Sequence, residues 1–161
     1  MKKILALIVV LVSMLFGCQS TPPSPESVSI SAVYAFNMNT LDNSNSPSAI
    51  VAKLKSVSLI GCPKDFIDAY NRYVSAWAGF AQLEKKMYAQ DLKKADADFA
   101  SFISEYQSNP SEATVKLKQD WKSLAGEIDI IAGELSRSFA DLKVVGAKYD
   151  VPYVPRAWYS M

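Results

Sequence analysis

The sequence contains no histidine among its 161 residues. Histidine is the commonest general base, the commonest transition-metal ligand and the simplest pH switch in proteins. Its absence also excludes a di-iron site of the Glu-x-x-His kind. Nucleophile-elbow, P-loop and dinucleotide-binding glycine motifs are missing as well. A carboxylate pair assembled from distant positions stays open, but we expect a protein that is not an enzyme and uses no cofactor or metal ion.

Cysteine is scarce, because the chain has only Cys18 and Cys62. Cys18 ends a segment that begins with two lysines and continues as an almost wholly apolar run from Ile4 to Phe16. About a dozen apolar residues are too few to span a bilayer as a helix, but they suit the apolar region of a secretory signal. The sequence therefore predicts an exported protein.

The run Leu15-Phe16-Gly17-Cys18 resembles the lipobox of bacterial lipoproteins. The resemblance implies that residues 1–17 are a signal peptide and that Cys18 is lipidated on its thiol and acylated on its new amine. Several acyl chains anchor a protein firmly, since each buried methylene contributes about 0.8 kcal/mol. The residue after Cys18 is Gln19 and not Asp. In Gram-negative lipoproteins this pattern implies export to the outer membrane, so we expect the protein on its periplasmic face. The alternatives are an N-terminal transmembrane anchor and a soluble secreted protein.

Neither sign of charge predominates in the expected mature chain. Removal of residues 1–17 leaves about 144 residues, with 15 basic and 16 acidic side chains. This length suits one domain with a tether, and the charge balance gives no reason to expect nucleic acid as a partner. With Cys18 lipidated, Cys62 has no partner in the chain. We expect Cys62 to be buried and inert, with intermolecular pairing or a reactive thiol as alternatives.

Apolar residues recur at helical spacing in three segments, approximately 47–60, 63–107 and 111–149. Prolines at their starts and the Ser108-Asn109-Pro110-Ser111 stop fit these boundaries. The sequence thus predicts an all-α fold, an elongated antiparallel helical bundle of about three helices. A break of the second helix around 90–96, where apolar residues become sparse, is the alternative.

The ends of the chain are expected to be extended. Residues 18–46 read as a Ser- and Pro-rich tether followed by a strap, in which residues 28–38 alternate with a strand-like period of two; a short helix is the alternative. Residues 47–161 form the helical domain, whose aromatic and proline-bearing tail after residue 149 we expect to pack back on the helices. Gly126 and Gly133, seven residues apart, suggest a place where another helix approaches closely.

The start of the second helix carries a C-P-x-x-F-x-x-A-Y-x-x-x-x-x-A-W pattern from Cys62 to Trp77. This pattern resembles one found in uncharacterised helical envelope proteins of bacteria, and it brings no known activity.

Acidic residues also recur every seven positions on the long helices. We expect these to flank the apolar face and pair with lysines, with cation binding as the alternative; they are Glu84, Asp91, Asp98, Glu105, Asp120, Glu127, Glu134 and Asp141.

The leading hypothesis is a non-enzymatic, lipid-anchored envelope protein whose helices bind a protein partner. The alternative is a carrier of an apolar small molecule held between aromatic-rich helices. A large exposed apolar patch favours the first hypothesis, and surplus aromatic side chains favour the second. For the carrier, the predicted lining residues are Tyr70, Tyr73, Trp77, Phe80 and Trp121.

Overall fold

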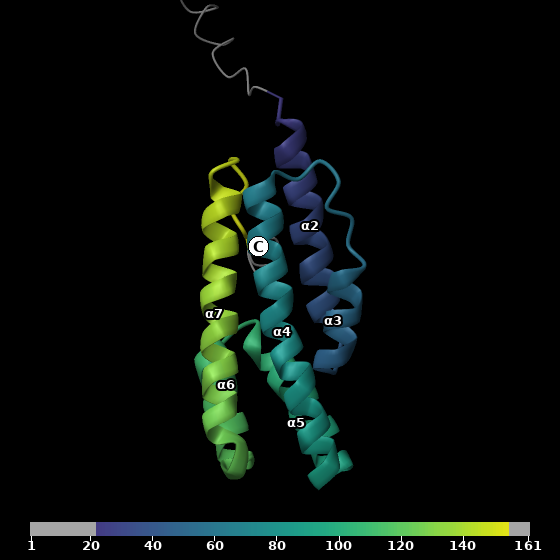
Figure 1. Cartoon of the computed structure of the whole chain (residues 1–161), viewed down its shortest axis with the longest axis vertical. Helices are drawn as coiled ribbons and strands as arrows, with labels where there is room; N and C mark the ends of the chain where they lie inside the picture. The colour runs from purple at the N-terminus through teal and green to yellow at the C-terminus, as the bar shows by residue number, and fades with distance from the viewer. Residues whose placement is uncertain (1–21, 155–161) are drawn as a thin grey trace, which may run out of the picture.

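The computed structural model describes residues 22–154, which form helices without any β-strand in that range (Figure 1). The prediction of an all-α fold is confirmed, but the prediction of about three helices is wrong, because the described chain forms six α-helices and one short 3-10 helix. Cys18 and residues 155–161 lie outside the described part. The elements are α2 (Pro25–Asp42), α3 (Pro47–Lys55), α4 (Lys64–Gln90), α5 (Leu92–Tyr106), α6 (Pro110–Asp120), η1 (Lys122–Leu124) and α7 (Ala125–Ala147).

The stretch expected to be an extended strap is the helix α2. Ser24 caps its start, accepting a hydrogen bond from the backbone N–H of Ser27 at 3.1 Å, and Pro25 occupies the first helical position. Two of the residues on its buried face, Asn37 and Thr40, are polar. The hydrophobicity of the sequence therefore does not show which face of this helix is buried. These buried residues are Ile30, Val33, Tyr34, Asn37, Thr40 and Leu41.

The second predicted helix is divided at Asp91, inside the interval given for the alternative. Asp91 has an extended backbone and caps the start of α5 by accepting a hydrogen bond from the N–H of Lys94 at 3.0 Å. The third predicted helix is divided at Trp121, which ends α6. The first ends at Lys55 instead of residue 60, and Ile60, the last residue of the predicted range, is 89% exposed.

Helix α4 is central, because it packs against α7, α3 and α5 (Figure 1). It runs antiparallel to α7: Tyr149, just past α7, donates to the Asp65 carboxylate at 2.8 Å, and Lys86 forms an ion pair with Glu127 at 2.6 Å. The core between these helices is aromatic. Its largest fully buried side chains include Trp77, Tyr70, Phe66, Phe80 and Phe99.

The close approach of helices occurs at a glycine other than those expected. The side chain of Tyr34 in α2 lies against α7, where its hydroxyl group is next to Gly146 and donates a hydrogen bond to the Leu142 carbonyl at 2.9 Å. A Cβ at Gly146 would overlap that hydroxyl. The expectation for Gly126 and Gly133 is wrong, because a Cβ at either position would meet nothing within 4 Å.

Candidate functional site

Four of the five predicted lining residues lie together on the buried face of α4. Tyr70, Trp77 and Phe80 are at most 1% exposed and belong to the core. The Tyr70 hydroxyl donates to the Leu54 carbonyl at 3.0 Å, which joins α4 to α3. Phe80 packs on Phe102, with ring centroids 4.9 Å apart. Tyr73 is the one of the five that lines a cavity whose wall is mostly apolar.

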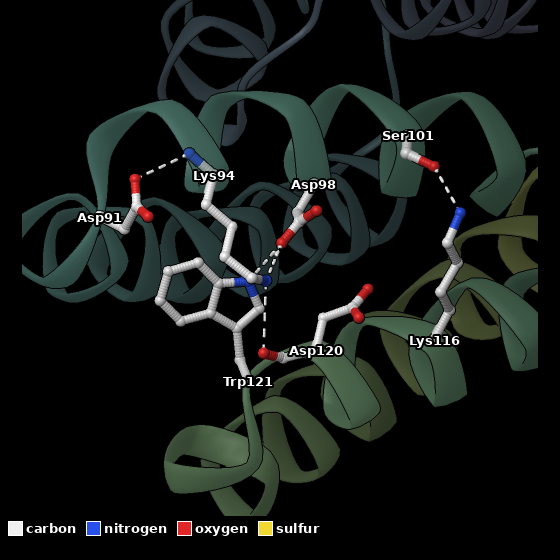
Figure 2. Close-up of polar contacts among 7 residues, drawn as sticks. All are labelled: Asp91, Lys94, Asp98, Ser101, Lys116, Asp120 and Trp121. Atoms are coloured by element: carbon white, nitrogen blue, oxygen red, sulfur yellow. Dashed lines mark hydrogen bonds and ion pairs between the residues drawn. The ribbon is translucent and has the colours of Figure 1, made fainter.

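Trp121 lies elsewhere, at the joint between α6 and η1. Its indole Nε1 donates to Asp98 of α5 at 2.7 Å, and Lys94 Nζ lies 4.4 Å from the ring centroid (Figure 2). The same ammonium pairs with Asp98 and donates to the Asp120 carbonyl at 3.3 Å. Figure 2 also shows Lys116 reaching Ser101, at 3.0 Å. Trp121 therefore fastens α6 to α5 and does not share a site with the α4 aromatics.

A cavity of about 510 Å³ lies between α2, α4, α5, α7 and the segment after α7. Its size falls in the range of small-molecule sites, about 300–1,000 Å³. Most of its wall is aromatic or aliphatic, and two oppositely charged side chains, Asp42 and Lys143, lie exposed at its rim. The main apolar lining residues are Met38, Leu41, Tyr73, Tyr106, Phe139 and Tyr153.

Phe139 organises the aromatic wall. Its ring centroid is 4.8 Å from that of Tyr153 and 5.5 Å from that of Tyr73. Tyr153 also meets Tyr34 edge to face at 5.0 Å, so the segment after α7 is held against α2. Lys143 Nζ lies 4.9 Å from the Phe139 centroid. These contacts pack the rings of Tyr73, Phe139 and Tyr153 against one another.

Burial changes the acidity of the lining phenols. Desolvation raises the pKa of Tyr106 to about 12. The pKa of Tyr153 is also raised to about 12, by burial and by the charge of Asp42, against a lowering effect of the nearby Asn37 side chain. These phenols are therefore neutral donors and acceptors across the physiological pH range.

We predict that these two tyrosines ionise late in an alkaline titration. Their folded pKa values exceed the unfolded value of about 10, so their contribution to stability is complete below pH 10 and is lost as the pH rises through about 12. Phenolate absorbance should therefore show no Tyr106→Phe or Tyr153→Phe difference near pH 10 in the folded protein. A step near pH 10 that disappears in either variant would contradict the burial described.

Asn37 lies just behind the cavity wall. It is fully buried, and hydrogen bonding with its amide lowers the pKa of Tyr73 and of Tyr153 against the larger, raising effect of burial. Asn37 and Trp77 both lie close enough to the Tyr73 hydroxyl to lower its pKa, although the larger effect of burial raises it. A small group of neutral polar atoms thus adjoins the apolar cavity.

The structure also bears on the expectations for Cys62, which is only partly buried, and for Glu84. Burial raises the pKa of the Cys62 thiol, and this opposes the reactive-thiol alternative, which needs a lowered pKa. Glu84 was expected on a solvated flank, but it is 2% exposed, whereas Lys86–Glu127 and Lys94–Asp98 form the expected ion pairs. Within residues 22–154, no three His, Cys, Asp or Glu side chains converge to hold a metal ion.

The sequence signal for the cavity is weak. Tyr106, Phe139 and Tyr153 come from three separate segments of the sequence. The spacing of apolar residues within one segment does not show that these three side chains border the same cavity.

None of the helices in the described range is both long and apolar enough to cross a membrane. Comparisons with protein-family models, with curated proteins and with solved structures give no match.

Proposed function

We propose that this protein is a lipid-anchored, non-enzymatic envelope protein whose helical domain binds an apolar small molecule. Cys18 is the proposed attachment site, with the protein on the periplasmic face of the outer membrane. The observation that supports ligand binding is the cavity of about 510 Å³ with its aromatic wall. Within the described residues, six helices arranged as an elongated bundle would hold this cavity.

The hypothesis of a protein partner has weaker support. Six large apolar side chains are exposed among the described residues, and they come from α2, α5, α6, α7 and the segment before α4. Two share α7 but are fourteen residues apart, or about 21 Å along the helix. The exposed residues are Val28, Ile60, Leu92, Val115, Ile130 and Val144.

A variant that fills the cavity tests the proposal. Ser136 is exposed on α7 and lines the cavity, so Ser136→Trp would place an indole in it at little expected cost to the core. Arg137→Trp adds the same side chain at the next exposed position, which lines a different surface. Binding of the neutral probe N-phenyl-1-naphthylamine to the full acylated chain is measured by fluorescence.

We expect wild type and Arg137→Trp to bind the probe equally, and Ser136→Trp to bind it at least about tenfold more weakly. Native mass spectrometry of protein gently extracted from its own membrane should show a small apolar adduct that Ser136→Trp lacks. Equal probe binding by all three proteins would place the ligand elsewhere and contradict the proposal. A co-purifying protein of defined stoichiometry, with no adduct, would favour the protein-partner hypothesis.

A further inference from the structure

We infer that the end of the helical bundle next to the lipid anchor contacts the membrane directly, through the exposed side chains of Val28 and Ile60. The partner of this surface is a lipid bilayer, and the contact is apolar. The inference rests on one part of the proposed function, the anchor at Cys18, and it is independent of the cavity.

The first argument is the short connection between the anchor and the bundle. Because the expected strap is a helix, α2 begins at Pro25, only seven residues after Cys18. Seven residues span at most about 25 Å even when they are fully extended. Helix α4 alone, with 27 residues, is about 40 Å long. A lipidated Cys18 therefore keeps the end of the bundle at which α2 begins close to the membrane.

The second argument is which side chains lie at this end. Figure 1 shows the start of α2, the segment between α3 and α4, and the end of α7 at the same end of the bundle. The segment between α3 and α4 approaches α2 closely, since a Cβ at Gly61 would lie 2.6 Å from the Ser29 Oγ. Ile60 and Val28 are the sequence neighbours of these two residues. Both apolar side chains therefore belong to the end that faces the anchor.

The third argument is exposure. Ile60 is 89% exposed and Val28 is 55% exposed, and Ile60 is the most exposed of the large apolar side chains in the described range. Removal of apolar surface from water is favourable in proportion to its area. Apolar side chains that bind a membrane surface enter the boundary between the headgroups and the acyl chains. A bilayer within reach of this end would remove both side chains from water.

The fourth argument is charge. Lys64, at the start of α4, forms an ion pair with Asp68 at 2.6 Å, and Lys148, just after α7, forms one with Asp65 at 3.5 Å. Recognition of anionic lipids uses clusters of basic side chains, whereas each of these two lysines has an acidic partner. We therefore expect neutral lipids to support the contact, without any need for an anionic headgroup.

Depth-dependent fluorescence quenching tests the inference. The full acylated chain is placed in vesicles of dioleoylphosphatidylcholine, with a nitrobenzoxadiazole dye on a single cysteine introduced by Ile60→Cys or Val28→Cys. Cys62→Ser removes the other thiol in every variant. Leu92→Cys is the matched control, because Leu92 is also large, apolar and exposed but follows the opposite end of α4. The quencher is a lipid with a nitroxide near the top of one acyl chain.

We expect the dyes at positions 60 and 28 to be quenched at least about twofold more strongly than the dye at position 92. Ile60→Asp should reduce the quenching of the dye at position 28 at least about twofold, because a carboxylate loses its hydration among acyl chains. Leu92→Asp should leave that quenching unchanged. Both substitutions replace exposed side chains, so neither is expected to disturb the core.

Several outcomes would overturn the inference. Equal quenching at positions 60 and 92, or quenching at position 28 that Ile60→Asp leaves unchanged, would mean that this end only lies near the bilayer. A blue shift of the dye at position 60 that grows with the protein-to-lipid ratio, without lipid quenching, would assign the surface to a second copy of the chain. Wild type that carries no acyl group and does not float with the vesicles would contradict the proposed anchor itself, and the inference with it.

Discussion

Replacing Gly146 with alanine should lower the free energy of unfolding by about 3 kcal/mol, although alanine is the better helix former. The new methyl group would overlap the Tyr34 hydroxyl and lie 2.8 Å from its Cζ. Tyr34 is almost fully buried and packs on Phe66 and Tyr153, with centroids 5.6 and 5.0 Å away, so its ring has little room to move. Its displacement would also break the hydrogen bond to the Leu142 carbonyl.

Gly133→Ala is the matched control, because it makes the same change in the same helix where a Cβ meets nothing within 4 Å. It should raise the free energy of unfolding by up to about 1 kcal/mol through helix propensity alone. Urea unfolding of both variants gives the comparison. A double variant with Tyr34→Phe, which removes the overlapping oxygen, should lose less than the sum of the two single variants. Similar effects of Gly146→Ala and Gly133→Ala would contradict the close approach of α2 and α7.

The second large effect is expected from Glu84→Ala, which should cost about 3 kcal/mol. The Glu84 carboxyl group is buried and accepts hydrogen bonds from the Ser48 backbone N–H at 3.0 Å and from the Ser48 hydroxyl. Its other oxygen accepts from the Tyr88 hydroxyl at 3.0 Å. The glutamate thereby binds the first turn of α3, where N–H groups have no partner within the helix. Its removal leaves the part-buried Ser48 N–H without this acceptor, at about 1–3 kcal/mol, and leaves a void where the Glu84 side chain was buried.

Glu134→Ala provides the control, since Glu134 belongs to the acidic series with seven-residue spacing and is exposed on α7. Substitutions at such surface positions usually change stability by less than about 0.5 kcal/mol. Glu84→Gln keeps the shape and one acceptor, so it should cost less than Glu84→Ala. Thermal and urea unfolding measure all three variants. A cost for Glu84→Ala no larger than that for Glu134→Ala would show that Glu84 does not hold α3 in place.

The helical class follows from the sequence because apolar spacing identifies a helical face locally. The ends of the helices follow less well, because they depend on single polar side chains in extended conformations. Asp91 caps α5 in the middle of a continuous apolar stripe, and Trp121 interrupts another. Helix α2 was missed for a related reason: Asn37 and Thr40 occupy its buried face. Local hydrophobicity does not reveal a polar residue that is buried by its neighbours.

The candidate site was predictable only in part. Spacing on α4 placed Tyr70, Tyr73, Trp77 and Phe80 inward, but it does not say which of them meets a neighbouring helix and which borders a gap. That distinction depends on the register of α5 and α7, which place Tyr106 and Phe139 opposite Tyr73. Trp121 was grouped with them because it is aromatic and apolar, whereas its indole N–H is bonded to Asp98.

The contacts of α2 with the far end of the chain also determine the order in which the protein can complete its fold. Ser27 donates to the Tyr149 carbonyl at 2.7 Å, across 122 residues, and Tyr34 reaches Leu142 across 108. The contacts of Lys116 with Ser101 and of Lys94 with Asp120 span only 15 and 26 residues. Short loops close at a lower entropic cost, so α5 and α6 can pair early. During synthesis, which proceeds from the N-terminus, α2 is the first of the described helices to be made and is expected to be among the last to find its place.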